Sequence, residues 1–195
     1  MWTKIISSTA LCLGLTLSPA MAQEASTAPA EPSQAPQPQT EPQIGQPYLG
    51  SNEKDWDVIC IKSDQETDPC EIRQLVLDQN KDPMIEITLE RISGQQGAVV
   101  GATVIVPLET ILTVPLTLAI DGAKGKQYPY TFCNSVGCIA RIGLTQSDVD
   151  AMKRGKMAEL SLSHLTVSDR LVTIPVSLSG FTAAYDKATV KTIAN

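Results

Sequence analysis

Aromatic and histidine side chains are scarce in this sequence. Phenylalanine, tryptophan and tyrosine together make up 4% of the residues, and His164 is the only histidine. A core with so few aromatic rings has to be built largely from Val, Ile and Leu, and these residues favour strands wherever they alternate with polar ones. We therefore expect a mostly β protein.

Catalytic sequence motifs are also missing. The chain contains no G-x-S-x-G nucleophile elbow, glycine-rich phosphate loop, H-E-x-x-H zinc motif or calcium-loop spacing. His164 is expected to be a solvated or rim histidine. A serine hydrolase needs its base near the nucleophile, and the sequence does not show that His164 meets any serine. Glu86 and Glu90 share one face of an expected strand and could act as an acid–base pair, but such residues more often solvate a sheet. We expect no catalytic residue and no cofactor.

Basic residues are outnumbered by acidic ones. The chain has 15 Lys and Arg against 21 Asp and Glu, a formal net charge of −6. Loss of Lys4 with a cleaved signal would leave 14 against 21, a formal charge of −7. Binding to phosphate groups needs clustered Lys and Arg. The composition therefore argues against nucleic acid and against anionic lipid as partners.

The N-terminus predicts a secretory signal peptide over residues 1–22. Lys4 supplies the positive charge, residues 5–17 the apolar segment, and Ala20-Met21-Ala22 the cleavage site. The apolar segment is too short to span a bilayer, so we expect no transmembrane segment in the mature chain. Lipidation at Cys12 is not expected, because the residue before it is not small. These features predict a periplasmic or secreted protein.

A Pro- and Gln-rich linker is expected over residues 23–50. Its Ala, Pro, Gln, Glu, Ser and Thr residues cannot bury enough apolar surface to offset their conformational entropy. A second interpretation, a proline-rich ligand for an aromatic groove, lacks a basic or aromatic anchor near residues 36–38. The folded domain is then expected over residues 51–195.

Four cysteines remain after the expected cleavage: Cys60, Cys70, Cys133 and Cys138. An even number in an exported chain indicates structural disulfides. The two local pairings, Cys60 with Cys70 and Cys133 with Cys138, are favoured because each would join neighbouring strands or close a tight loop. A redox pair is less consistent with these spacings, since neither is C-x-x-C. A metal site would have only His164 to add to the thiols.

Turn-punctuated strands and two short helices fill the rest of the chain. Strands are expected at 56–61, 71–79, 84–90, 139–144, 157–162 and 171–178, with two or three more inside 98–120. The stretch 98–120 is the most apolar, so we expect it to be mostly core. The alternative is an exposed patch that docks a partner or an outer-membrane surface.

Helices are expected at 146–154 and after Gly180. Thr145 and Asp148 have capping-box spacing, and Gly155 ends the first helix. In the second, Phe181, Ala184, Tyr185 and Ala188 form one apolar face, which we expect to lie against the sheet. These elements predict an all-β fold, an antiparallel β-sandwich with one or two short helices.

Several segments together resemble a known family. They are Trp56 to Cys60 followed by Cys70, the run from Pro107 to Ile120-Asp121-Gly122, Cys133 to Ala140, and Val176 to Ala184. In order and spacing they resemble the invasion-associated locus B (IalB) family of exported alphaproteobacterial proteins, over residues 56–188. The chain departs from that pattern at Leu108-Glu109-Thr110, where glycines are usual, and in its linker.

The resemblance carries expectations about structure and function. It implies a β-sandwich in the cell envelope, strengthens the local disulfide pairing, and transfers no catalytic residue. The implied function is a non-enzymatic binding module whose partner is an unknown envelope or host-surface protein, with a contribution to host-cell interaction. The alternative is an envelope enzyme with an unrecognised active site.

Overall fold

The structure, a computed structural model, describes residues 41–93, 97–167 and 169–193. The expected signal peptide at 1–22 and most of the expected linker lie outside these residues. Within the described part, no helix combines the length and the apolar character needed to cross a membrane.

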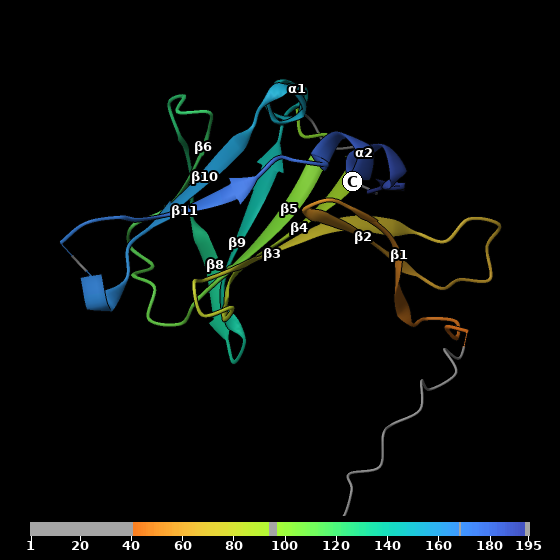
Figure 1. Ribbon diagram of the computed structural model, residues 1–195, viewed down its shortest axis with the longest axis horizontal. Helices are drawn as coiled ribbons and strands as arrows, with labels where there is room; N and C mark the ends of the chain where they lie inside the picture. The colour runs from red at the N-terminus through yellow and green to blue at the C-terminus, as the bar shows by residue number, and fades with distance from the viewer. Residues whose placement is uncertain (1–40, 94–96, 168, 194–195) are drawn as a thin grey trace, which may run out of the picture. The chain divides into compact units, whose positions relative to one another are not determined.

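Two β-sheets form the body of the fold (Figure 1). The larger sheet has the order β1-β2-β3-β4-β5-β9-β8, with β12 paired to β4, and the smaller has the order β11-β10-β6-β7. The strands of the larger sheet are β1 (Pro47–Glu53), β2 (Trp56–Ile61), β3 (Cys70–Leu77), β4 (Pro83–Ser93), β5 (Val100–Val106), β8 (Tyr130–Asn134), β9 (Gly137–Leu144) and β12 (Val190–Thr192). Those of the smaller sheet are β6 (Leu116–Ile120), β7 (Lys126–Tyr128), β10 (Met157–Leu162) and β11 (Val172–Ser177). All pairings are antiparallel except that of β12 with β4, so the predicted antiparallel β-sandwich is confirmed.

The core lies between the inner faces of the two sheets. In β4, Ile85, Ile87 and Leu89 are buried while the residues between them are half-buried. Strands β10 and β11 show the same alternation, as Leu160 and Ile174 illustrate. This period of two is the one that the sequence shows, because successive side chains of a strand point to opposite faces.

Helix α1 spans Gln146–Arg154, as predicted. The Asp148 carboxylate accepts a hydrogen bond from the Thr145 backbone N–H at 3.0 Å, and the Thr145 hydroxyl accepts one from the Asp148 N–H at 3.4 Å. This reciprocal capping box satisfies N–H groups that have no partner inside the helix. Gly155 caps the C-terminal end.

Helix α2 spans Phe181–Lys187 and packs against the larger sheet beside β1 and β2 (Figure 1). Phe181 is fully buried and meets Trp56 edge-on, with ring centroids 5.4 Å apart. Gly180 precedes the helix with φ +88°, and a Cβ at this position would clash with the Glu53 carbonyl oxygen. The predicted terminal helix and its buried apolar face are therefore confirmed.

Strand β1 corrects the expected linker boundary. Residues 47–50, expected in the linker, belong to β1, which pairs with β2, with Pro47 opposite Ile61 and Tyr48 opposite Cys60. Composition could not reveal this, because β1 is an edge strand with mostly exposed side chains. Its place in the sheet depends on backbone hydrogen bonds to β2, which any residue except proline can donate.

The apolar stretch 98–120 is core at its two ends and carries exposed leucines in its middle. Strands β5 and β6 bury Val100, Val104 and Leu116, whereas Leu108 and Leu112 are 48% and 47% exposed. The expectation that the stretch is mostly core is therefore wrong for the segment between the two strands. Pro107 and Pro115 bound that segment, and proline interrupts strand pairing.

Candidate functional site

Both cysteine pairs in the structure are local. Cys60 and Cys70 are disulfide-bonded across β2 and β3, where they stand opposite each other in the register. Cys133 and Cys138 are bonded across the β8–β9 hairpin, also as direct partners. Each disulfide therefore joins adjacent strands of the larger sheet.

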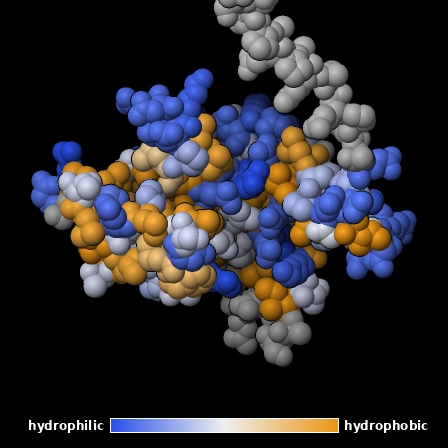
Figure 2. Space-filling view, turned by 90° about the horizontal axis from the view of Figure 1, so that it is seen from below, coloured by the Kyte–Doolittle hydropathy of each residue, from blue (hydrophilic) through white to orange (hydrophobic). Residues whose placement is uncertain are grey.

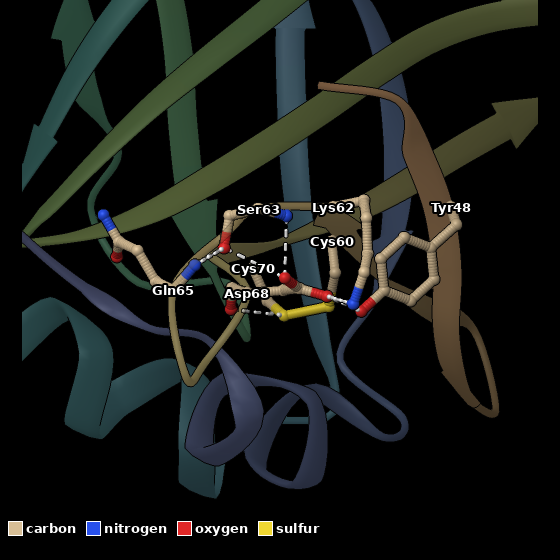
Figure 3. Close-up of polar contacts among 7 residues, drawn as sticks. All are labelled: Tyr48, Cys60, Lys62, Ser63, Gln65, Asp68 and Cys70. Carbon is tan, nitrogen blue, oxygen red and sulfur yellow. Dashed lines mark hydrogen bonds and ion pairs between the residues drawn. A yellow bond between two sulfur atoms is a disulfide. The ribbon is translucent and has the colours of Figure 1, made fainter. Parts of the chain in front are cut away.

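Beside the first disulfide, Asp68 organises the loop between β2 and β3 (Figure 3). Its carboxylate accepts hydrogen bonds from the Tyr48 hydroxyl at 2.7 Å and from the Ser63 N–H at 2.8 Å, and Lys62 Nζ lies 3.3 Å away. The Tyr48 hydrogen bond is the main reason why the pKa of Asp68 is held well below its usual value. Because its partners all belong to β1 and the loop, this carboxylate stabilises the fold and is not free for catalysis.

Cys70 also anchors the C-terminal segment. Its N–H donates to the Thr189 hydroxyl at 2.9 Å, and its carbonyl accepts from the Thr189 N–H at 3.0 Å. The following strand, β12, pairs in parallel with the end of β4. Cys70, the first residue of β3, is thus linked to β2 by the disulfide and to the C-terminal segment by hydrogen bonds.

The candidate acid–base pair lies on the outer face of the larger sheet. Glu86 and Glu90 alternate with buried residues of β4, and Glu71 of β3 lies close to Glu90. Burial, and then the charge of Glu90, raise the pKa of the Glu71 carboxyl. The sequence analysis missed Glu71, because its proximity depends on the β3–β4 register.

Glu71 and Glu90 border a groove of about 630 Å³ that also includes Arg141 and Lys191, whereas Glu86 lies outside it. Lys191 Nζ lies 3.7 Å from the Glu90 carboxylate. In residues 41–93, 97–167 and 169–193, no group of three or more His, Cys, Asp or Glu side chains could hold a metal ion. The groove has charges of both signs on an open sheet face, and no geometry in it singles out a general acid or base.

His164 joins two loops. Its Nε2 lies 3.0 Å from the Leu108 carbonyl oxygen, and its Nδ1 lies 2.9 Å from the Thr166 hydroxyl. Among the described residues, no hydrogen bond connects the ring to a serine hydroxyl or to a carboxylate. The imidazole is therefore positioned to hold the loops together, and among the described residues the only hydroxyl hydrogen-bonded to it is that of its near neighbour Thr166.

The two loops that His164 joins are the segment between β5 and β6 and the segment between β10 and β11. Thr110 forms a β-bridge with His164, and the Leu165 N–H donates to the Glu109 carbonyl at 3.0 Å. Thr110 and Ser163 are buried at this junction. The backbones of the two loops thus support each other.

These paired loops carry four exposed leucines. The residues are Leu108, Leu112, Leu165 and Leu171, each between 47% and 62% exposed, and we call them the leucine surface. In Figure 2, hydrophobic side chains are prominent on the left, the side toward which the β10–β11 connection extends in Figure 1. Exposed apolar side chains gathered on ordered loops are typical of interaction sites.

Fold and surface together define a two-disulfide β-sandwich with an exposed apolar loop surface. A family model described as "Invasion associated locus B (IalB) protein" matches residues 56–189. The chain therefore belongs to the IalB family.

Individual proteins agree with this assignment. Invasion protein B homologs from Brucella abortus strain 2308 and from Brucella abortus biovar 1 (strain 9-941) are each 27% identical over 144 residues, covering 73% of this chain and 80% of the relative. The crystal structure of invasion associated protein b from Bartonella henselae matches with a TM-score of 0.60 at 19% identity, covering 70% of this chain and 93% of that one. This structural match supports the fold.

Proposed function

We propose that this chain is an exported, non-enzymatic protein of the cell envelope that binds a partner protein through its leucine surface. The observation that carries the proposal is the set of four exposed leucines on two mutually supported loops. Export to the periplasm or beyond is supported by two disulfides, since oxidising compartments preserve them. The N-terminal signal pattern gives the same indication.

A protein partner fits this surface better than a lipid bilayer does. The charged residues of the paired loops are Glu109, Asp169 and Arg170, and the chain as a whole has a formal charge of −6. Envelope lipids that carry negative charge attract clusters of Lys and Arg, and the leucine surface has no such cluster. An apolar protein surface requires no positive charge, so it is the complementary partner.

The biological role that we propose is interaction with the host cell. It rests on the Brucella relatives, which are named invasion protein B homologs. A non-enzymatic role is supported by the position of His164, whose nitrogens contact only Leu108 and Thr166 in the described part.

Site-specific photocrosslinking in intact cells tests the partner proposal. A photoreactive residue at Leu165 should give a discrete adduct with another protein, whereas one at Leu75, which is 46% exposed on the outer sheet face, should not. In the purified complex, Leu108→Ser with Leu112→Ser should weaken binding. Each leucine contributes about 1 kcal/mol when its exposed half is buried, so the expected loss is at least about tenfold in Kd.

Three outcomes would contradict the proposal. Adducts only with lipid would make the surface a membrane contact, and adducts only between copies of this chain would make it a dimer interface. Equal adducts from the Leu165 and Leu75 probes would show that the leucine surface has no special role.

A further inference from the structure

A cleft lies between helix α1 and the β6–β7 hairpin, apart from the leucine surface. Its volume is about 480 Å³, within the range of about 300 to 1,000 Å³ that is typical of small-molecule sites. Leu118 and Ile120 of β6, Tyr128 of β7 and Ala151 of α1 form part of its lining. Two sheet strands and one helix thus shape it.

The floor of this cleft is apolar and continuous with the core. Leu118 and Ile120 are only partly buried, although they pack against the core residues. Leu118 also borders a small apolar void of about 20 Å³ between the sheets. In this cleft the apolar side chains of Leu118 and Ile120 are therefore accessible to solvent. An apolar ligand could cover their exposed surface.

Cations without an ion-pair partner stand at the rim. Lys124 and Arg154 both line the cleft, and within the part of the chain that the structure describes neither is in an ion pair. Lys126, in contrast, lies 2.6 Å from the Asp148 carboxylate. Asp121 is also engaged, since it accepts a hydrogen bond from the Met157 N–H at 2.9 Å.

Tyr128 adds a neutral polar group. Burial, followed by the nearby Asp148 charge, raises the pKa of its hydroxyl. A tyrosine hydroxyl is protonated at neutral pH even without this shift, so the group can donate a hydrogen bond. Lys124 and Arg154 are the charged side chains of the cleft that have neither an ion pair nor a side-chain hydrogen bond among the described residues. Asp121 has no ion pair either, but its carboxylate is occupied by backbone N–H groups.

We propose that this cleft binds a single-chain amphipathic carboxylate, a ligand with one anionic head and an apolar tail. The head would bind Lys124 and Arg154, because a guanidinium and a carboxylate form charge-assisted hydrogen bonds. The tail would cover Leu118 and Ile120. A neutral ligand would leave the two cations unused, and a polyanion would meet the carboxylates of Asp121 and Asp148.

Calorimetric titration of the purified chain with dodecanoate, below its micelle concentration, tests the proposal. We expect one site per chain and binding at least about tenfold weaker for 1-dodecanol, which lacks the charge. Lys124→Gln with Arg154→Gln should weaken dodecanoate binding by at least about tenfold. Ala151→Leu, which narrows the cleft without a charge change, should weaken dodecanoate and dodecanol alike.

The matched control is Lys54→Gln with Lys81→Gln, which removes two exposed positive charges outside both the cleft and the leucine surface. It should leave the affinity within about twofold, since exposed charges beyond a Debye length are screened. The absence of saturable binding, or an equal loss in control and cleft variants, would overturn the proposal. Binding to phosphatidylglycerol vesicles but not to monomeric dodecanoate would also overturn it, in favour of a membrane surface. None of these results depends on the leucine surface, so the two proposals fail separately.

Discussion

Phe181 offers the sharpest test of how the sandwich is held together. Its ring is fully buried between Trp56 and Tyr185, with centroid distances of 5.4 and 5.7 Å. Truncation of a buried phenylalanine to alanine costs about 3 to 5 kcal/mol in lost burial and residual cavity. This is a large part of the roughly 5 to 15 kcal/mol by which a domain is stable.

The measurement is urea denaturation followed by circular dichroism. With an m value of about 2 kcal/mol/M, a loss of about 4 kcal/mol lowers the midpoint by about 2 M urea. Phe181→Leu, which keeps most of the volume, should lose less than half as much. If Phe181→Ala is too unstable to purify, the Leu variant still reports the burial.

The chain supplies a matched control, because Phe132 is its only other phenylalanine. Phe132 lies on β8 and is 45% exposed, so Phe132→Ala should lower the midpoint by less than about 0.5 M urea. A Phe181→Ala midpoint equal to that of wild type, or to that of Phe132→Ala, would refute the reasoning and make Phe181 a candidate for partner contact.

Three further predictions address the backbone, the charges and the disulfides. Gly180→Ala should destabilise the fold by at least about 1 to 3 kcal/mol, because φ is +88° and the new Cβ would meet the Glu53 carbonyl; an unchanged urea midpoint would contradict this. The pKa of Glu71 is raised in the folded state, so its protonated carboxyl favours the fold. This contribution to the free energy of unfolding is present below the unfolded pKa of about 4.3 and is lost as pH rises through the folded pKa. Glu71→Gln should therefore gain stability over wild type at neutral pH but not near pH 4, and an offset independent of pH would count against the burial of that charge. Non-reducing peptide mapping should yield Cys60–Cys70 and Cys133–Cys138, and serine replacement of either pair should cost about 2 to 3 kcal/mol; a peptide linking Cys70 to Cys133 would contradict the pairing.

Local sequence patterns predicted the elements whose interactions are local. Helix α1 matched the prediction residue for residue, because the Thr145–Asp148 capping box and Gly155 act within one turn of its ends. Strands β2 and β10 also matched, since their alternation of apolar and polar residues reflects a single buried face.

Pairing partners could not be predicted in the same way. In β3, residue polarity alone misplaces two neighbours, because the apolar Leu75 is exposed while the polar Gln74 is buried. The Gln74 amide donates hydrogen bonds to the carbonyls of Asp55 and Ser177 at 2.9 and 3.0 Å. These acceptors lie 19 and 103 residues away in the chain, and no local pattern encodes such distances.

The candidate sites show the same division. The sequence identified the 98–120 stretch as unusually apolar, but the leucine surface depends on the β5–β6 segment meeting the β10–β11 segment through His164. The cleft likewise joins Lys124 of a hairpin to Arg154 at the end of a helix. Tertiary structure brings the residues of each site together, and no local sequence pattern marks any of them as part of a site.

The junction at Cys70 has a consequence for the order of folding. The Cys60–Cys70 disulfide closes a separation of 10 residues, whereas the Thr189 hydrogen bonds to Cys70 span 119. Short loops close at a lower entropic cost than long ones, so the β2–β3 hairpin can form early. The C-terminal segment with β12 then docks onto strands that are already paired. Late docking contributes to the unfolding barrier and hardly to the folding rate. We therefore expect Thr189→Ala to accelerate unfolding while the refolding rate stays nearly unchanged. Release of the C-terminal segment would then determine the unfolding rate of the protein.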